Sequence, residues 1–377
     1  MNAIIEQDRY YPCSHGKVSN MTREADVAIV GGGVVGQLLA LALSDRGRTV
    51  LLLDAGPACP PASWAGGGIL SALFPWRYPD PLTALTLDAC TRYQVLARRI
   101  LAVEGPDPEI LTCGMHVEAG DEMAAALSWA ERYAISAEPA SDSPLGAEGV
   151  VSFPTIAAIR NPRLLKGLAT LLAAEHVAVQ RPVTVVGMDA VAGRWRLETS
   201  AGVVVAQQVA LSAGAWSAGL LASRGLQMPL MPVKGEMLLY GPQVPAPPHI
   251  LLAREGYVIP RADGHMLVGS TVQPGLMDHR LTDEAGRFLE NVAARLWPPL
   301  VGQIPLAQWA GIRPGSSRSW PIMGELPGGP GLFVATGHYR NGLVSAPASA
   351  ELLADLMCGR TPSLDPEPYS VSSSSPP

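Results

Sequence analysis

The chain has 377 residues, more than one compact core usually supports, so we expect two domains. Hydrophobic residues make up 48% of it and charged residues only 16%, which predicts a large inaccessible interior with room for an enclosed cofactor. The formal net charge of −6, without any Lys/Arg cluster, argues against nucleic acid and membrane surfaces as partners and favours small molecules.

The first 24 residues are predicted to form an N-terminal extension. They lack the apolar core of a signal peptide, so we expect a cytoplasmic protein. The five cysteines are widely spaced and form no CxxC pair, which indicates neither a disulfide framework nor a zinc site. Residues 27–44 carry no charge, but their central glycines argue against a membrane-spanning helix.

Residues 25–56 carry the strongest local pattern. DVAIV and TVLLLD are predicted as buried strands, and VVGQLLALALSDRG between them as a helix. Gly31, Gly33 and Gly36 fit the pattern G-x-G-x-x-G, in which the glycines allow a tight turn, approach to a pyrophosphate and helix packing. Asp54 follows at the spacing of a ribose-binding acid. The unit predicts a dinucleotide site, and a purely structural turn is the alternative.

The pattern changes further along the chain. NPRLLKGLATLLAAEHV predicts an amphipathic helix from Pro162, and short strands follow at 177–186 and after residue 194. The segments 93–149 and 228–300 contain alternating strands such as GYVIPRADGHMLVGST, typical of an antiparallel second domain inserted twice. The closing SVSSSSPP predicts a flexible tail.

Four segments, in this order, resemble the flavin-dependent D-amino-acid oxidase superfamily and, within it, the glycine oxidases. They are GGGVVG, SWAGGGIL, LSAGAWS, and GIRPG together with GHYRNGL. The resemblance spans about residues 25–360 and implies an α/β fold with a Rossmann-like FAD-binding domain of the GR2 type. That domain would comprise 25–92, 150–227 and 301–365. An α+β substrate-binding domain on an antiparallel sheet would comprise 93–149 and 228–300, with a flexible tail at 366–377.

The resemblance implies FAD as the cofactor and assigns it the small residues of these segments. Small residues let the backbone approach a planar ring, and backbone N–H groups can stabilise negative charge on the reduced flavin. A glycine-rich surface loop and a structural tryptophan are the plain alternatives. The implied FAD contacts are Gly31, Gly33, Val34, Val35, Gly36, Asp54, Ser63, Trp64, Ala65, Gly66, Gly67, Gly68, Val183, Ala213, Gly214, Trp216, Gly337, Arg340, Asn341, Gly342 and Leu343.

The resemblance also implies a substrate site. Arg313 would grip the substrate carboxylate, Arg340 would be a second anchor, and Tyr257 would add a hydroxyl. A planar guanidinium can hold a carboxylate through two parallel N–H bonds, a geometry that lysine lacks. Val272 stands where glycine oxidases have a pocket-lining methionine, which predicts a wider site. The alternative for both arginines is an ordinary surface or salt-bridged role.

The implied activity is FAD-dependent oxidative deamination of glycine or an N-substituted glycine. Hydride transfer from Cα to flavin N5 would give an imine, which hydrolyses to glyoxylate and ammonia or an amine, or feeds thiazole synthesis in the thiamine pathway. O2 would reoxidise the flavin and yield H2O2. The cofactor carries the chemistry, so no catalytic side chain is expected beyond those that position the substrate, and no metal is expected.

Several alternatives stay open at this point. Sarcosine, D-proline or D-amino-acid oxidases and dehydrogenases share the expected fold, with O2 or a quinone as acceptor. A structural FAD-binding subunit is the non-enzymatic alternative, and an NAD-dependent dehydrogenase would explain only residues 31–54. Lys234 and Glu236 are interpreted as structural, and the sequence is compatible with a homo-oligomer.

Overall fold

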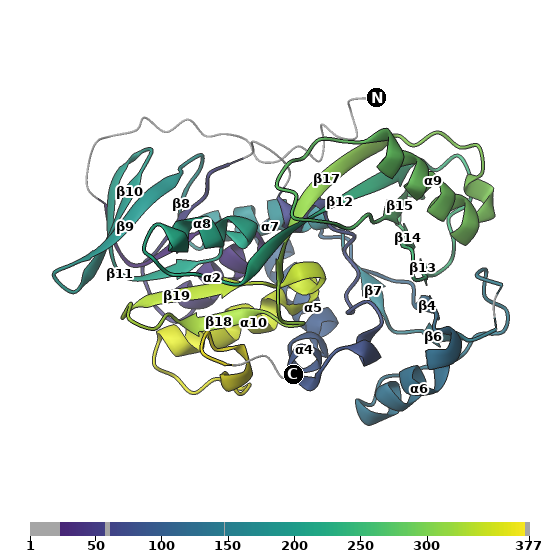
Figure 1. The fold of residues 1–377 in the computed structure, drawn as a ribbon, viewed down its shortest axis with the longest axis horizontal. Helices are drawn as coiled ribbons and strands as arrows, with labels where there is room; N and C mark the ends of the chain where they lie inside the picture. The colour runs from purple at the N-terminus through teal and green to yellow at the C-terminus, as the bar shows by residue number, and fades with distance from the viewer. Residues whose placement is uncertain (1–22, 57–60, 147, 374–377) are drawn as a thin grey trace.

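The computed structural model describes residues 23–56, 61–146 and 148–373, and it contains two large β-sheets (Figure 1). The first sheet has eight strands, and its central path runs β18, β19, β11, β1, β2, β8. The strands are β1 (Arg23–Val30), β2 (Val50–Leu53), β8 (Ala178–Gln180), β9 (Val185–Val191), β10 (Arg194–Thr199), β11 (Gly202–Leu211), β18 (Ile322–Glu325) and β19 (Leu332–Thr336). The centre is parallel, because β1 pairs in parallel with β2 and β11, and β19 with β11.

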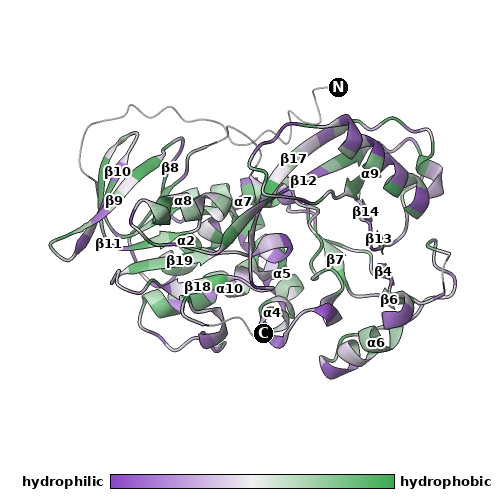
Figure 2. Ribbon diagram, in the orientation of Figure 1, coloured by the Kyte–Doolittle hydropathy of each residue, from purple (hydrophilic) through white to green (hydrophobic). Residues whose placement is uncertain are grey.

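Helices cover this sheet and explain its uninterrupted apolar strands. Side chains alternate along β1, so Val27 and Ile29 join the core under one layer of helices, while Ala28 and Val30 join the core on the opposite face. The helices of the first layer are α2 (Val34–Ser44), α4 (Asp80–Thr86), α5 (Ala89–Ala102), α7 (Asn161–Ala174) and α10 (Gly342–Met357). The opposite face packs against the β9–β10 hairpin and the short α8 (Ser217–Ala222). Figure 2 shows α10 and β19 largely in the hydrophobic colours, whereas the β9–β10 hairpin carries hydrophilic stretches.

The second sheet has nine strands, and most neighbours in it are antiparallel. Its long path runs β16, β12, β15, β14, β13, β4, β6, β5, and β17 pairs with β12. The strands are β4 (Met115–Glu118), β5 (Glu138–Pro139), β6 (Val150–Phe153), β12 (Leu230–Tyr240), β13 (Ile250–Leu252), β14 (Tyr257–Pro260), β15 (Met266–Gly269), β16 (Gln273–Pro274) and β17 (Ala307–Ser316). Helices α6 (Met123–Arg132) and α9 (Asp283–Leu296) pack on its opposite faces.

The remaining elements are short. They are α3 (Ala62–Ala65), the strand pair β3 (Leu111–Thr112) and β7 (Ala157–Ala158), and the 3-10 turns η1 (Pro75–Arg77), η2 (Gly120–Glu122), η3 (Gly214–Trp216), η4 (Pro298–Leu300), η5 (Tyr339–Asn341) and η6 (Glu367–Tyr369). No helix in the described ranges combines the length and apolar character needed to cross a bilayer, and residues 27–44 divide between β1 and α2.

The sheets place three segments differently from the expected domain ranges. Strands β6 and β17 lie in the second sheet, although residues from 150 and from 301 were expected in the cofactor-binding domain. Conversely, α5 packs Tyr93, Leu96 and Ile100 into the core of the first sheet, although residues from 93 were expected in the substrate domain. Strand pairing decides the membership of β6 and β17, and core packing decides that of α5, both through contacts distant in sequence that no local pattern encodes.

The prediction of a flexible tail from residue 366 is wrong for residues 366–373. Tyr369 is 2% exposed and its hydroxyl donates to Pro81 O at 2.7 Å. Arg318 Nη1 donates to Ser370 O at 2.7 Å, and Trp320 Nε1 donates to Pro368 O at 2.8 Å. The serine-rich composition could not predict these hydrogen bonds, because their partners Arg318, Trp320 and Pro81 are distant in sequence. Residues 374–377 and nearly all of the expected N-terminal extension lie outside the described residues.

Candidate active site

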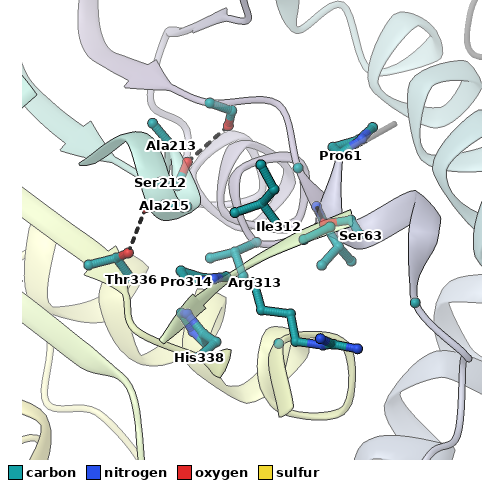
Figure 3. A pocket seen from close by; sticks show the side chains of 18 of the residues that line it. Pro61, Ser63, Ser212, Ala213, Ala215, Ile312, Arg313, Pro314, Thr336 and His338 are labelled. Atoms are coloured by element: carbon teal, nitrogen blue, oxygen red, sulfur yellow. Dashed lines mark hydrogen bonds between the residues drawn. The ribbon is translucent and has the colours of Figure 1, made fainter. Parts of the chain in front are cut away.

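A cavity of about 610 Å³ lies between the two sheets. Its lining includes the carboxyl ends of β1, β2 and β19 and the residues that directly follow β11. The carboxyl ends of parallel strands are the usual ligand position in an α/β sheet, and the volume is typical of a ligand pocket. Strands β14 and β17 close the cavity from the second sheet, so both sheets contribute to one site (Figure 3).

The glycine turn after β1 forms one end of the cavity. Gly31 has φ +111°, and a Cβ there would lie 2.5 Å from Ser212 O, so only glycine fits. A Cβ on Gly36 would lie 1.9 Å from Gly31 O, because α2 packs directly on the turn. The helix begins at Val34, so its N-terminus, which favours anions, faces the cavity.

Asp54 is held at the end of β2 by three donors. Its Oδ2 accepts from Gly32 N at 2.6 Å, and its Oδ1 accepts from Gly56 N at 3.0 Å and from Arg181 Nε at 2.7 Å. The sequence did not point to Arg181, which follows β8 and reaches Asp54 because β8 and β2 are neighbours. The carboxylate is therefore fixed beside the glycine turn.

The segment 63–68 forms the wall between the two sheets. Ser63 Oγ accepts from Val34 N at 3.0 Å, which ties this segment to the start of α2. Asn161 Nδ2 donates to Ser63 O at 2.8 Å and to Gly66 O at 3.1 Å. A Cβ on Gly67 would lie 3.1 Å from the ring of Tyr257, so this glycine lets the segment pack tightly on β14.

Arg313 supplies positive charge at the other end of the cavity. Its Nη2 donates to Ser270 Oγ at 2.7 Å and its Nη1 to Thr271 O at 3.3 Å. Burial lowers the pKa of Arg313, and the nearby charge of Arg340 lowers it further. None of the ion pairs found among residues 23–56, 61–146 and 148–373 involves Arg313. A half-buried guanidinium that lines a cavity and has no carboxylate partner favours binding of an anion.

Gly235 makes room for this guanidinium. It lies on β12, the strand paired with β17, and a Cβ there would lie 2.1 Å from Arg313 Nη1 and 2.5 Å from its Cζ. Figure 3 shows the Arg313 side chain extending from its strand, with Ser63, Ser212 and Thr336 around the same cavity. The sequence did not mark Gly235 as a site residue, because only strand pairing brings it to Arg313.

The other polar residues of this end differ in exposure. Tyr257 is 7% exposed, and its hydroxyl lies 3.5 Å from Met237 Sδ. Arg340 is exposed, with its guanidinium 5.4 Å from the centre of the Tyr339 ring. Burial lowers the pKa of His338 to about 4, so this imidazole is neutral at physiological pH.

Most residues named from the sequence line the cavity. These are Gly31, Gly33, Val34, Val35, Asp54, Ser63, Gly66, Gly67, Gly68, Val183, Ala213, Gly214, Trp216, Tyr257, Arg313, Arg340, Gly342 and Leu343. Gly36, Trp64, Ala65, Gly337 and Asn341 belong to the same segments but are not part of the lining. Lining residues that the sequence did not single out include Gly32, Asn161, Ser212, Ser270, Ile312, Thr336 and Tyr339.

Val272 is not part of the cavity lining. It is 39% exposed, whereas Thr271 beside it is buried and accepts through Oγ1 from Glu236 N at 2.8 Å. Successive side chains of an extended segment alternate in direction, so burial of Thr271 turns Val272 outward. The expectation that Val272 widens the pocket therefore fails in this arrangement.

Lys234 and Glu236 form a buried pair, with Lys234 Nζ 3.5 Å from Glu236 Oε1. Glu236 Oε2 also accepts from Gln308 Nε2 at 2.7 Å, and Glu236 Oε1 accepts from Thr282 Oγ1 at 3.2 Å. These contacts join β12, β17 and the start of α9 away from the cavity, in line with the structural role expected for both residues.

Comparison with known proteins identifies the architecture around this cavity. A family model described as FAD dependent oxidoreductase (DAO) matches residues 26–356. The chain belongs to the DAO family. Two relatives, the glycine oxidases of Pseudomonas aeruginosa and Pseudomonas putida, are each 42% identical to it and align with 91% of this chain and 97% of their own.

A solved structure of a DAO-family protein extends this similarity. The glycine oxidase of Geobacillus kaustophilus has a TM-score of 0.89 at 29% identity and covers 94% of this chain and 100% of its own. The resemblance to the D-amino-acid oxidase superfamily and its glycine oxidases, and the expected fold, are thus confirmed. The protein is an FAD-dependent oxidoreductase of the DAO family.

The geometry of the cavity, apart from the family match, fits FAD. At Gly33 an added Cβ would approach only Ser63 Oγ, at 3.1 Å, so the backbone is open on the cavity side. The start of α2 offers partial positive charge to a pyrophosphate, and the fixed carboxylate of Asp54 offers acceptors to a ribose. The small residues of 66–68 leave the space that a planar ring needs.

Proposed function

We propose that this enzyme oxidises the amine of glycine or of an N-substituted glycine, with the substrate carboxylate on Arg313. The half-buried guanidinium of Arg313, which lines the cofactor cavity and has no carboxylate partner in the described part of the chain, is the observation that carries the proposal. An amino acid supplies the missing negative charge. The names of the two Pseudomonas relatives support a small amino-acid substrate.

We propose that each wall of the cavity binds a different part of FAD. The turn 31–35 with the start of α2 holds the pyrophosphate, Asp54 the ribose, and the backbone near Val183 the adenine. The segments 63–68 and 337–343 enclose the ring, with Ala213, Gly214 and Trp216 beside the phosphates. When bound, FAD supplies the acceptor for the two electrons that leave the substrate Cα–H bond.

The chain contributes binding and orientation. Arg313 offers charge-assisted N–H bonds, each contributing about 1.5–3 kcal/mol, and its contacts with Ser270 and Thr271 fix the direction of the fork. The Tyr257 hydroxyl adds a polar contact, and the exposed Arg340 a second cation near the mouth. Holding the carboxylate at one point limits the positions of Cα and the amine, which is how positioning accelerates a reaction.

The products follow from amine oxidation. The imine hydrolyses to glyoxylate and ammonia, or to glyoxylate and an amine from an N-substituted glycine, or is consumed in thiazole synthesis. We propose O2 as the final electron acceptor, with release of H2O2. A cytoplasmic location and a homo-oligomer stay predictions from the sequence.

A substrate panel tests the proposal. The FAD-loaded enzyme is mixed anaerobically with glycine, sarcosine, longer N-alkyl glycines, D-alanine or D-proline, and loss of the flavin absorbance is followed. Methylamine, which lacks the carboxylate, is the matched control. We expect glycine or an N-alkyl glycine to reduce the flavin fastest and methylamine to fail. Equal reduction by methylamine, or no reduction by any glycine derivative, would contradict the proposal.

A further inference from the structure

Five carbonyl groups of segment 63–68 are held by four residues from three other parts of the chain. Asn161 binds two of them, and Trp309, Arg261 and the backbone of Ile159 bind one each. The distances are 2.8 Å for Ser63 O and 3.1 Å for Gly66 O to Asn161 Nδ2, 3.0 Å for Ala65 O to Trp309 Nε1, 2.9 Å for Gly67 O to Arg261 Nη2, and 2.8 Å for Gly68 O to Ile159 N.

This arrangement fixes the direction of the N–H groups. In a trans peptide the carbonyl and the following N–H point in opposite directions, and the peptides on both sides of Gly67 are trans. The N–H groups of Gly67 and Gly68 therefore point away from Asn161 and Arg261. Within the described ranges neither N–H has a hydrogen-bond partner, and both glycines line the cavity. They are two donors available to a bound ring.

Arg261 is the charged member of this set and, like Trp309 of β17, links the second sheet to segment 63–68. It directly follows β14 in the second sheet, while Gly67 lies in the segment between β2 and α4 of the first. Its Nη2 donates to Gly67 O and its Nη1 donates to Ile159 O at 3.0 Å. Burial and the neighbouring Arg160 lower the pKa of Arg261 to about 10, which leaves it protonated at neutral pH.

We propose that Arg261 is a positioning residue for the flavin. By holding Gly67 O, it presents the Gly68 N–H to the ring, where such donors favour the electron-rich reduced form. The same contact keeps Gly67 against Tyr257, so cofactor wall and substrate wall are held together. The proposal rests on the placement of the flavin against 63–68, and it is independent of which amino acid is oxidised.

Three variants test the proposal on the purified protein. Arg261→Met removes both bonds, and Arg261→Lys keeps the charge but loses the fork that reaches two carbonyls. Arg318→Met is the matched control, because Arg318 also donates to backbone carbonyls, those of Ser370 and Val371, away from the cavity. The measured quantities are the FAD Kd of the apoprotein and the midpoint potential of the bound flavin.

We expect Arg261→Met to weaken FAD binding at least tenfold and to lower the midpoint potential. Each tenfold loss of preference for the reduced form corresponds to about 30 mV for a two-electron couple. Arg261→Lys should lie between this variant and the parent. Arg318→Met should lower the Tm and leave the potential unchanged.

An unchanged potential in Arg261→Met overturns the proposal, even if Tm or FAD affinity falls, since a merely structural role predicts that result. If Arg261→Met does not fold, the same criterion applies to Arg261→Lys. The FAD Kd and the midpoint potential are both measured without an amino acid, so their outcome does not depend on whether glycine is the substrate.

Discussion

Arg313 has the features expected of a residue that binds an anion. It lines the cavity half-buried, it lacks a carboxylate partner within the described part of the chain, and two hydrogen bonds fix its guanidinium. Its location depends on a neighbour without a side chain, because a Cβ on Gly235 would overlap the guanidinium. Substrate affinity should therefore depend on Gly235 as well as on Arg313.

Gly235→Ala should raise the KM for the amino acid about tenfold or more, which corresponds to roughly 1.4 kcal/mol. The added methyl group displaces the guanidinium, while the glycine turn after β1 is untouched. Steady-state kinetics and the FAD Kd measure the two effects. Gly187→Ala in β9 is the control, because the nearest atom to its Cβ is at 3.7 Å. An unchanged KM in Gly235→Ala would show that Arg313 does not need this space.

At the residue scale, the sequence predicted what lies in contiguous motifs. Gly31, Gly33 and Asp54 could be assigned because their spacing within one βαβ unit fixes their geometry. Arg181, Gly235 and Asn161 could not, since each reaches the site through pairing or packing with a distant segment. Arg313 was identified by resemblance alone, and no local pattern revealed its place in the cavity lining.

At the scale of elements, the sheet membership of β17 and the ordered C-terminal segment 366–373 could not be predicted from local sequence patterns. The segment GIRPG lies in β17, which runs beside β12 in the second sheet, although its position in the chain suggested the cofactor domain. Residues 366–373 look unstructured in composition but are anchored by Arg318, Trp320 and the carbonyl of Pro81. Both outcomes depend on contacts distant in sequence.

Deletion of residues 366–377 should therefore destabilise the folded protein. Burial of Tyr369 contributes roughly 1.5–3 kcal/mol, and each lost hydrogen bond about 1 kcal/mol. We expect the Tm to fall by several degrees in thermal unfolding. Deletion of residues 374–377 alone is the matched control, with little expected change. Equal Tm values for the two truncated proteins would refute the anchoring role of 366–373.

At the scale of the whole molecule, the two sheets contribute different residues to one cavity. The first sheet supplies the glycine turn, Asp54 and the start of α2, and the second supplies Tyr257 and Arg313. The sequence indicated two domains and their order along the chain. Only the structure shows that β6 and β17 belong to the second sheet. This division predicts that cofactor binding and substrate binding can be separated by mutation.

The most direct test is anaerobic reduction of the flavin by glycine in the parent and in Arg313→Met, with Arg313→Lys as the conservative variant. Loss of two charge-assisted bonds removes about 3 kcal/mol or more, so Arg313→Met should need at least a hundredfold more glycine. Its FAD Kd should equal that of the parent, and Arg313→Lys should recover part of the affinity. Half-saturation of Arg313→Met at the parent's glycine concentration would contradict the assignment of the carboxylate to Arg313.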